Sequence, residues 1–162
     1  MRALTIQNPY PHLIVTPQSE LPKYAYQKRV ENRVWECKIR ETIAIHAGLS
    51  MRWFAFDDYP CPDGKLKPAM FPEMAFGAFV GLATISACFH EEDLWDDKLP
   101  ADMQWLKTHV HVAGPYCFVF SEVWRLKTPI PCTGKLGLWT VPDDIVRKIA
   151  ETNLIPVPFT FL

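Results

Sequence analysis

The chain lacks the motifs that mark the best-defined enzyme classes. It has only seven glycines in 162 residues, and it contains no Gly-rich phosphate loop, nucleophile elbow or kinase signature. No apolar run approaches the length of a membrane span, about 18 to 20 residues, and the start Met1-Arg2-Ala3-Leu4 lacks the apolar core of a signal peptide. We therefore expect a cytoplasmic protein with no membrane partner.

Metal and redox motifs are also missing. The five cysteines are odd in number and lack the paired short spacing of a zinc ribbon or a redox motif, so we expect reduced thiols. His109 and His111 would share a face of an extended segment and could hold one ion, but no carboxylate or cysteine at a diagnostic spacing supports them. The sequence predicts no metal and no cofactor.

Neither sign of charge is in excess over the whole chain. The 17 basic and 18 acidic side chains exclude the global positive field of proteins that bind long duplex nucleic acid. Basic residues are frequent between positions 20 and 41, whereas the segment Glu91–Asp97 is strongly acidic. Any affinity for nucleic acid must therefore be local. The acidic segment leaves open another function, that of an adaptor which recruits a protein.

The tract 28–35 carries the most chemistry. It sets three cations, a carboxylate, an amide and an indole within eight residues. In an extended tract, Lys28 and Glu31 would lie on opposite faces. Lys28 would supply a mobile point charge, Arg33 a planar fork for phosphate or carboxylate, and Glu31 an acceptor for a base amino group. The alternative is a surface strand in which Glu31 pairs with a neighbouring arginine.

The hydrophobic pattern predicts an α+β fold in a single domain, 1–162. Strands are expected at 3–7, 29–37, 42–47, 76–89, 116–128 and 134–141, which gives five or six strands. Helical segments are expected at 9–15, 48–56, around 94–106 and at 142–153, and the proline-rich segment 57–71 is expected to be a rim loop or lid. Because few helices separate the strands, the pattern favours a small mixed barrel over a doubly wound sheet.

The C-terminal tail, Leu154–Leu162, is unusually apolar for a terminus, so we expect it to cover a surface. One interpretation is that the tail crosses the barrel and completes its core. The other is that it docks on a second copy of the chain and forms a homodimer.

The order of motifs resembles the ASCH domain family, which has a PUA-like barrel. The matching segments are Asn8-Pro9-Tyr10, the tract 28–35, Ile43-Ala44-Ile45-His46-Ala47, Gly77-Ala78-Phe79-Val80-Gly81, and Pro129-Ile130-Pro131 leading to Gly134 and Trp139. Asn8-Pro9-Tyr10 replaces the family's Gln-Pro-Trp, and Arg29 stands where Thr is common. The resemblance covers about residues 3–141 and leaves the C-terminal helix and tail, 142–162, outside it.

The resemblance implies a cleft that binds RNA or a single-stranded or modified nucleotide. The expected ligand-binding residues are Asn8, Tyr10, Lys28, Glu31, Arg33, His46 and Tyr116. Two of them have an alternative interpretation: Tyr10 either stacks on a base or anchors the helical turn, and His46 is either a site residue or a hydrogen-bonded core histidine. Trp35 and Trp139 are expected in the core.

A second activity follows from the same resemblance. Some small ASCH-like proteins are amidohydrolases that remove acyl groups from N4-acylated cytidine with a Lys and a Thr three residues later. Lys28 matches the Lys, but Glu31 occupies the Thr position. In a hydrolase, Glu31 would act as a general base on water beside a Lys28 that positions the carbonyl oxygen.

Overall fold

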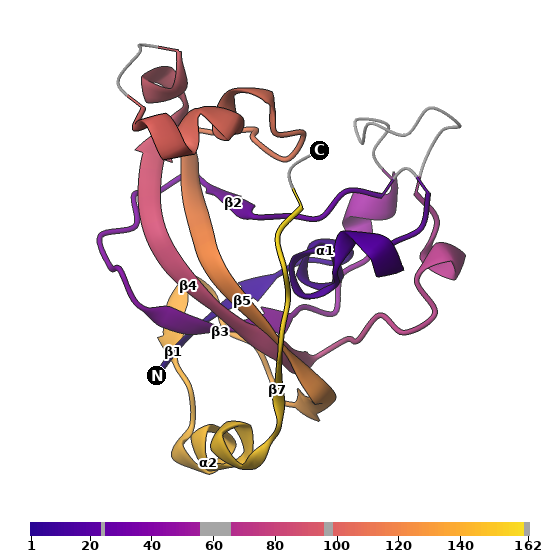
Figure 1. The fold of residues 1–162 in the computed structure, drawn as a ribbon. Coiled ribbons are helices and arrows are strands. Elements are labelled where there is room, and N and C mark those ends of the chain that lie inside the picture. The colour runs from indigo at the N-terminus through magenta and orange to yellow at the C-terminus, as the bar shows by residue number, and fades with distance from the viewer. Residues whose placement is uncertain (24, 56–65, 96–98, 161–162) are drawn as a thin grey trace.

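The computed structural model of the protein describes residues 1–23, 25–55, 66–95 and 99–160. Within these ranges the fold is α+β, and seven strands form one mixed sheet that curls into a partial barrel with few helices around it (Figure 1). This is the predicted fold class, with one strand more than the five or six expected.

The elements follow one another along the chain with helical segments mostly short. The strands are β1 (Arg2–Ile6), β2 (Val30–Arg33), β3 (Thr42–Ala47), β4 (Ala78–His90), β5 (Tyr116–Pro131), β6 (Leu138–Thr140) and β7 (Leu154–Pro156). The α-helices are α1 (Tyr10–Val15) and α2 (Asp143–Glu151). The 3₁₀ helices are η1 (Gln18–Glu20), η2 (Arg52–Ala55), η3 (Pro68–Met70), η4 (Glu91–Leu94) and η5 (Ala101–Thr108).

The two longest strands, β4 and β5, form the antiparallel centre of the sheet. On the β4 side the order continues through β3 and β1 to β6, and only β1 and β3 run parallel to each other. On its other edge β5 pairs with β2 at residues 116–119 and with β7 at residues 124–126. The strands β2 and β7 therefore follow each other along one edge of β5, although 120 positions or more separate them in the sequence.

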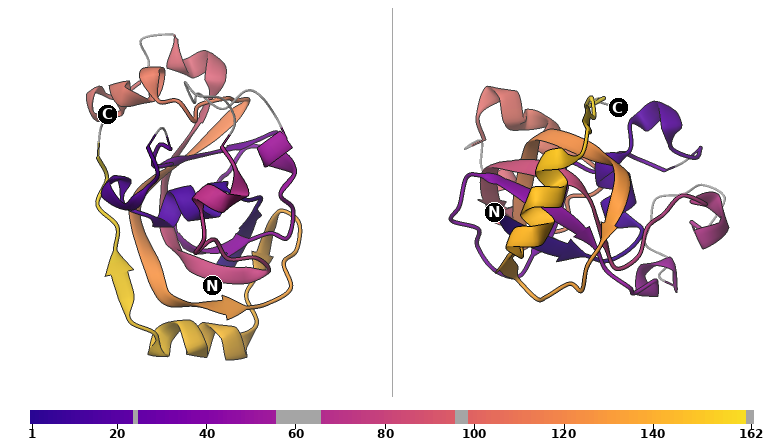
Figure 2. Two further views of the ribbon diagram at one scale, coloured as in Figure 1. Left: turned by 90° about the vertical axis from the view of Figure 1, so that its right-hand side faces the viewer. Right: turned by 90° about the horizontal axis from the view of Figure 1, so that it is seen from below.

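Helix α1 lies inside the curl of the sheet (Figure 2, left). Its residues Leu13 and Ile14 are fully buried, and the helix contacts β3, β4 and β5. Gly81 on β4 permits this approach, because a Cβ there would lie 2.2 Å from the carbonyl oxygen of Trp124 and 2.7 Å from Cγ1 of Val15. Any side chain at this position would push the helix or β5 away.

Helix α2 covers the lower end of the barrel, as the view from below shows (Figure 2, right). Ile145 and Ile149 are buried in a cluster with Phe79 and Trp139. The predicted core position of Trp139 is confirmed, and Trp35 packs partly buried against the main core cluster.

Some predicted boundaries were wrong. Strand β2 is shorter than the predicted 29–37, partly because the backbone N–H of Lys28 donates to the carbonyl of Leu13 (2.9 Å) and so turns the chain toward α1 before the strand begins. Strand β6 spans Leu138–Thr140 only, whereas β5 continues three residues beyond its predicted end at 128. The predicted rim loop lies mostly outside the described residues.

Among the described residues, no helix has the length and apolarity needed to cross a membrane. The four cysteines within those ranges are free, and Cys61 lies outside them.

The C-terminal tail completes the barrel of its own chain, as one interpretation predicted. Strand β7 pairs with β5, and Val157 is buried in the main core cluster. The Gln27 side chain donates to the carbonyl of Pro158 (2.8 Å) and accepts from the N–H of Thr160 (3.2 Å). The backbone carbonyl of Val157 accepts a hydrogen bond from Arg29. The homodimer stays a prediction, to be tested by mass in solution.

We predict that Val157→Ala lowers the free energy of unfolding by about 2 kcal/mol, since it removes two buried methyl groups from the core. Leu154→Ala is the matched control, because Leu154 is 37% exposed in the same tail. Urea unfolding measures both variants. If the free energy of unfolding falls by the same small amount in both variants, the tail does not contribute to this core.

Candidate functional site

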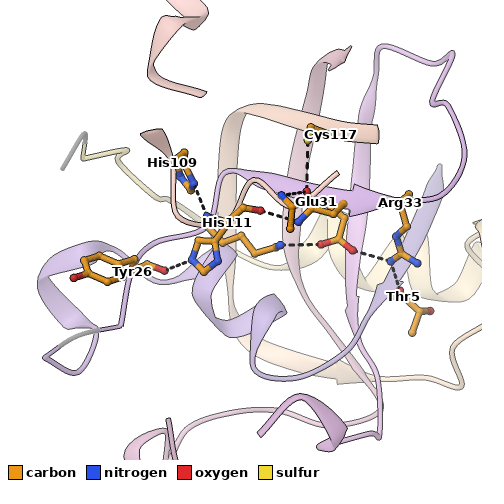
Figure 3. Close-up of polar contacts among 10 residues, drawn as sticks. Thr5, Tyr26, Glu31, Arg33, His109, His111 and Cys117 are labelled. Carbon is orange, nitrogen blue, oxygen red and sulfur yellow. Dashed lines mark hydrogen bonds and ion pairs between the residues drawn. The ribbon is translucent and has the colours of Figure 1, made fainter. Parts of the chain in front are cut away.

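Three charged side chains from the predicted tract meet in the interior and form the Lys28–Glu31–Arg33 network. The Glu31 carboxylate accepts from Lys28 Nζ at 3.4 Å and from Arg33 Nη2 at 3.0 Å. The exposed fractions of the side chains are 3% for Lys28, 8% for Glu31 and 23% for Arg33. Figure 3 shows Glu31 pointing toward Arg33, with Thr5 beyond it. Arg33 is therefore the member of the network nearest to solvent.

This arrangement corrects the predicted faces of the tract. Lys28 and Glu31 were expected on opposite faces of an extended strand, with Lys28 as a mobile charge. Instead, Lys28 precedes the strand and is held at Leu13 of α1, so its side chain turns back onto the carboxylate three residues later. The lysine is fixed and buried, and the glutamate pairs with an arginine inside the protein rather than at its surface.

Arg33 also connects β2 to β1. Its Nη2 donates to the backbone carbonyl of Thr5 at 2.8 Å, while its buried Nε has no hydrogen-bond partner within the part of the chain that the structure describes. A buried guanidinium nitrogen without an acceptor carries a desolvation cost of about 1–3 kcal/mol. The Nε group therefore has unused capacity to donate to an oxygen acceptor.

Tyr10 at the start of α1 covers the lysine. Lys28 Nζ lies 4.5 Å from the centre of the Tyr10 ring, within the range of a cation–π contact. The other neighbours of the ring are His111, at 6.1 Å between centroids, and Trp53, at 5.7 Å. Burial, and then the negative charge of Glu31, raises the pKa of the Tyr10 hydroxyl. The ring thus helps to anchor α1 and lies directly against the network.

Burial lowers the pKa of the Lys28 ammonium, and the positive charge of Arg33 lowers it further, whereas Glu31 opposes both effects. Desolvation favours the neutral amine because water no longer stabilises the cation. A lysine in such surroundings can serve either as a cation for an acceptor or as a base.

Beside the network, Asn32, His109 and His111 form a second group of hydrogen-bonded residues, which we call the second layer. The sequence did not predict this group. Asn32 Nδ2 donates to the His111 carbonyl (2.7 Å), and Asn32 Oδ1 accepts from the N–H of Ala113 (3.1 Å). The His111 ring bonds to the Tyr26 carbonyl (2.8 Å), and the backbone N–H of His111 donates to His109 Nδ1 (3.2 Å) (Figure 3). An asparagine inside a predicted strand was the available signal, since asparagine is depleted in strands.

Burial disfavours the charged form of both histidines of this layer. Burial, followed by the positive charge of Lys28, lowers the pKa of His109 to about 4 and that of His111 well below its ordinary value. In the part of the chain that the structure describes, no group of three or more His, Cys, Asp or Glu side chains is placed to hold a metal ion.

Asn8 lies beside a separate cavity of about 420 Å³. Its Nδ2 donates to the carbonyls of Gly48 (3.0 Å) and Ala75 (3.1 Å), which fixes the side chain, while its buried Oδ1 has no partner in the described ranges. Thr16 Oγ1, also without a partner, lines the same cavity. The volume falls in the range of small-molecule sites, about 300–1,000 Å³. Lys28 and Glu31 are not among the described lining residues.

The other two predicted residues lie in different surroundings, His46 in the core and Tyr116 on β5 across from β2. His46 is buried, and its Nε2 bonds to the Cys132 carbonyl (2.8 Å) between the rings of Phe79 and Trp139. This is the arrangement of a hydrogen-bonded core histidine. Tyr116 stands opposite Arg33 in the β2–β5 register and packs edge-on against His90 at 5.0 Å.

No protein-family model and no curated protein matches the chain. The resemblance to the ASCH family therefore rests on the motif residues themselves and stays a hypothesis.

We predict that Glu31→Gln lowers the free energy of unfolding by about 3 kcal/mol, because Lys28 and Arg33 would remain buried without a carboxylate. Glu41→Gln is the control: Glu41 pairs with Arg2 at the surface, where an ion pair contributes about 1 kcal/mol or less. Chemical denaturation distinguishes the two. A loss for Glu31→Gln no larger than that for Glu41→Gln would contradict the structural role of the network.

Proposed function

We propose that the protein is an ASCH-like module that binds RNA or a single-stranded or modified nucleotide at the Lys28–Glu31–Arg33 network. The observation that carries the proposal is the excess of positive charge in this network. Two cations converge on one carboxylate, and among the described residues no other acidic side chain pairs with either cation. Burying an uncompensated charge costs stability, so such an arrangement is typical of a site that receives an anion or a carbonyl oxygen.

Arg33 is the residue that a phosphate would meet first. It is the most exposed member of the network, and its Nε has no acceptor. Nη2 is already held by Glu31 and Thr5, which fixes the plane of the guanidinium. A fixed guanidinium can donate to phosphate oxygens with little loss of side-chain entropy.

Two further features suit a nucleoside. Tyr10 places an aromatic ring against Lys28, and Trp53 packs on Tyr10; base–aromatic stacking contributes about 1–3 kcal/mol per base. The cavity beside Asn8 offers an acceptor without a partner, Asn8 Oδ1, to an amino group of a base. The order of ASCH-like motifs along the chain supports the same ligand class.

We predict that Arg33→Gln weakens binding of a fluorescently labelled single-stranded RNA about tenfold, the effect of losing roughly 1.5 kcal/mol from one charged hydrogen bond. The dependence of affinity on salt should also become shallower, by about one unit of log–log slope. Fluorescence anisotropy at several salt concentrations measures both quantities, with single-stranded DNA of the same sequence as a parallel ligand.

Arg40→Gln is the matched control, because Arg40 is a basic residue near the same tract whose Nη1 donates to the backbone carbonyls of Cys37 (2.8 Å) and Ile39 (2.7 Å). Its affinity for RNA should match that of the wild type. Unfolding curves ensure that Arg33→Gln is compared as a folded protein, and Arg33→Lys should bind with intermediate affinity. Equal affinities for Arg33→Gln and Arg40→Gln would contradict the proposed site, and a wild type that binds no nucleic acid would favour the adaptor alternative.

A second candidate function, hydrolysis of an N4-acylated cytidine or a related acylated base, is favoured by the contact between Lys28 and Glu31. The 3.4 Å ion pair places a carboxylate beside a lysine whose pKa burial lowers. Glu31 could accept a proton from water as the water attacks the acyl carbonyl, while Lys28 holds the carbonyl oxygen. The bond between the acyl carbon and N4 then breaks, and N4 leaves with a proton as the free amine.

For a hydrolase, chromatography of N4-acetylcytidine incubated with the wild type would show cytidine and acetate. We predict that Lys28→Met, which keeps an unbranched apolar chain, abolishes product formation, while Lys38→Met, at an exposed lysine, retains it. Stabilisation by the nucleoside in a thermal-shift measurement without product would favour the binding module instead.

A further inference from the structure

A second cavity, of about 200 Å³, lies between η5 and the C-terminal tail and shares no lining residue with the cavity beside Asn8. Three rings line it and contact one another. The Trp105 ring lies 5.1 Å from those of His109 and Phe159, at interplanar angles of 62° and 64°, and the last two are 6.1 Å apart. The yellow tail of Figure 1 reaches η5 through the contact between Phe159 and Trp105. The cavity therefore has an aromatic wall.

A buried cation, Arg29, lies next to this aromatic wall. The Arg29 guanidinium lies 5.3 Å from the centre of the Phe159 ring, and its buried Nε and Nη1 have no hydrogen-bond partner among the described residues. No carboxylate among the described residues pairs with Arg29. Burial, and then the positive charge of Lys28, lowers the pKa of His109 to about 4, so this ring adds no charge of its own to the wall at neutral pH. An aromatic wall with the Arg29 cation behind it disfavours a cationic ligand and suits a neutral or electron-rich ring.

Size and polarity narrow the ligand further. A volume of about 200 Å³ is below that of sites for drug-sized ligands, about 300–1,000 Å³, so it accommodates one ring system rather than a whole nucleotide. The Gln27 amide at its edge is occupied, because Oε1 accepts from Thr160 and Nε2 donates to Pro158. Thr108 Oγ1 likewise donates to the Trp105 carbonyl (3.4 Å). Recognition would therefore rely on stacking rather than on hydrogen bonds.

We infer that the Trp105–His109–Phe159 cavity binds one nucleobase by stacking, as a second contact for a single-stranded nucleic acid. The inference rests on the proposed nucleotide binding and adds a subsite to it. Lys28 and Arg29, adjacent in the sequence, give the two sites their charge: Lys28 belongs to the network, and Arg29 backs the cavity. Because stacking is tolerant of base identity, this subsite should contribute affinity with little sequence preference.

The test compares a single-stranded RNA with an oligomer of the same length in which every base is replaced by an abasic sugar. Trp105→Leu should weaken binding of the RNA about tenfold, within the range for loss of one base–aromatic stack, and leave binding of the abasic oligomer unchanged. Trp95→Leu is the control, since Trp95 is 71% exposed and does not line the cavity. Free nucleosides, titrated separately, show whether the cavity takes a base without its strand.

Phe159→Leu is the second variant, in case Trp105→Leu does not fold, because it keeps apolar packing but removes the ring. Both variants should have wild-type affinity for the abasic oligomer. If the wild type binds RNA and both folded variants bind it with the same affinity, the inference is overturned and the proposed function stands. Absence of any RNA binding by the wild type would overturn both.

Discussion

The buried Glu31 carboxylate is the constraint on which the rest of the structure depends. It holds Lys28, whose backbone is tied to α1, and Arg33, which reaches the carbonyl of Thr5 on β1. One carboxylate thereby connects the inner helix with two strands that are far apart in the sheet order. An apolar side chain could fill the same space, yet it would leave two buried cations unpaired. The charged arrangement is therefore best understood through the ligand that we propose for it.

Periodicity and turn residues were sufficient to predict the fold class and most elements. The span of β3 was predicted at the observed bounds, and α1 and α2 were predicted within about one or two residues, because apolar runs bounded by Pro, Gly and Asp specify local structure. The seventh strand could not be predicted from its own residues. Strand β7 pairs with the part of the β5 edge that the short β2 leaves unpaired. Only the three-dimensional sheet shows that this part of the edge is unpaired by β2.

The sequence predicted which residues form the site better than it predicted how these residues are arranged. The tract supplied Lys28, Glu31 and Arg33, and these do meet, but alternation placed Lys28 on the face opposite Glu31 because it took the whole tract 28–35 as extended, whereas the observed strand begins at Val30. Asn8 and Tyr10, two positions apart, were expected to line one cleft, whereas Asn8 lines a cavity and Tyr10 covers the lysine. The layer of Asn32, His109 and His111 depends on contacts across 79 positions of sequence. Such contacts leave no periodic signal.

The most direct test of the account is a titration of ¹⁵N-labelled protein with a short single-stranded RNA, followed by two-dimensional NMR. We expect the arginine side-chain signal of Arg33 and the backbone amides of β2 and of the Asn8–Tyr10 turn to shift first, as the ligand oxygen reaches the network. Shifts confined to other surfaces, or no shifts at millimolar RNA, would contradict the claim that the excess positive charge around Glu31 serves to bind a nucleotide.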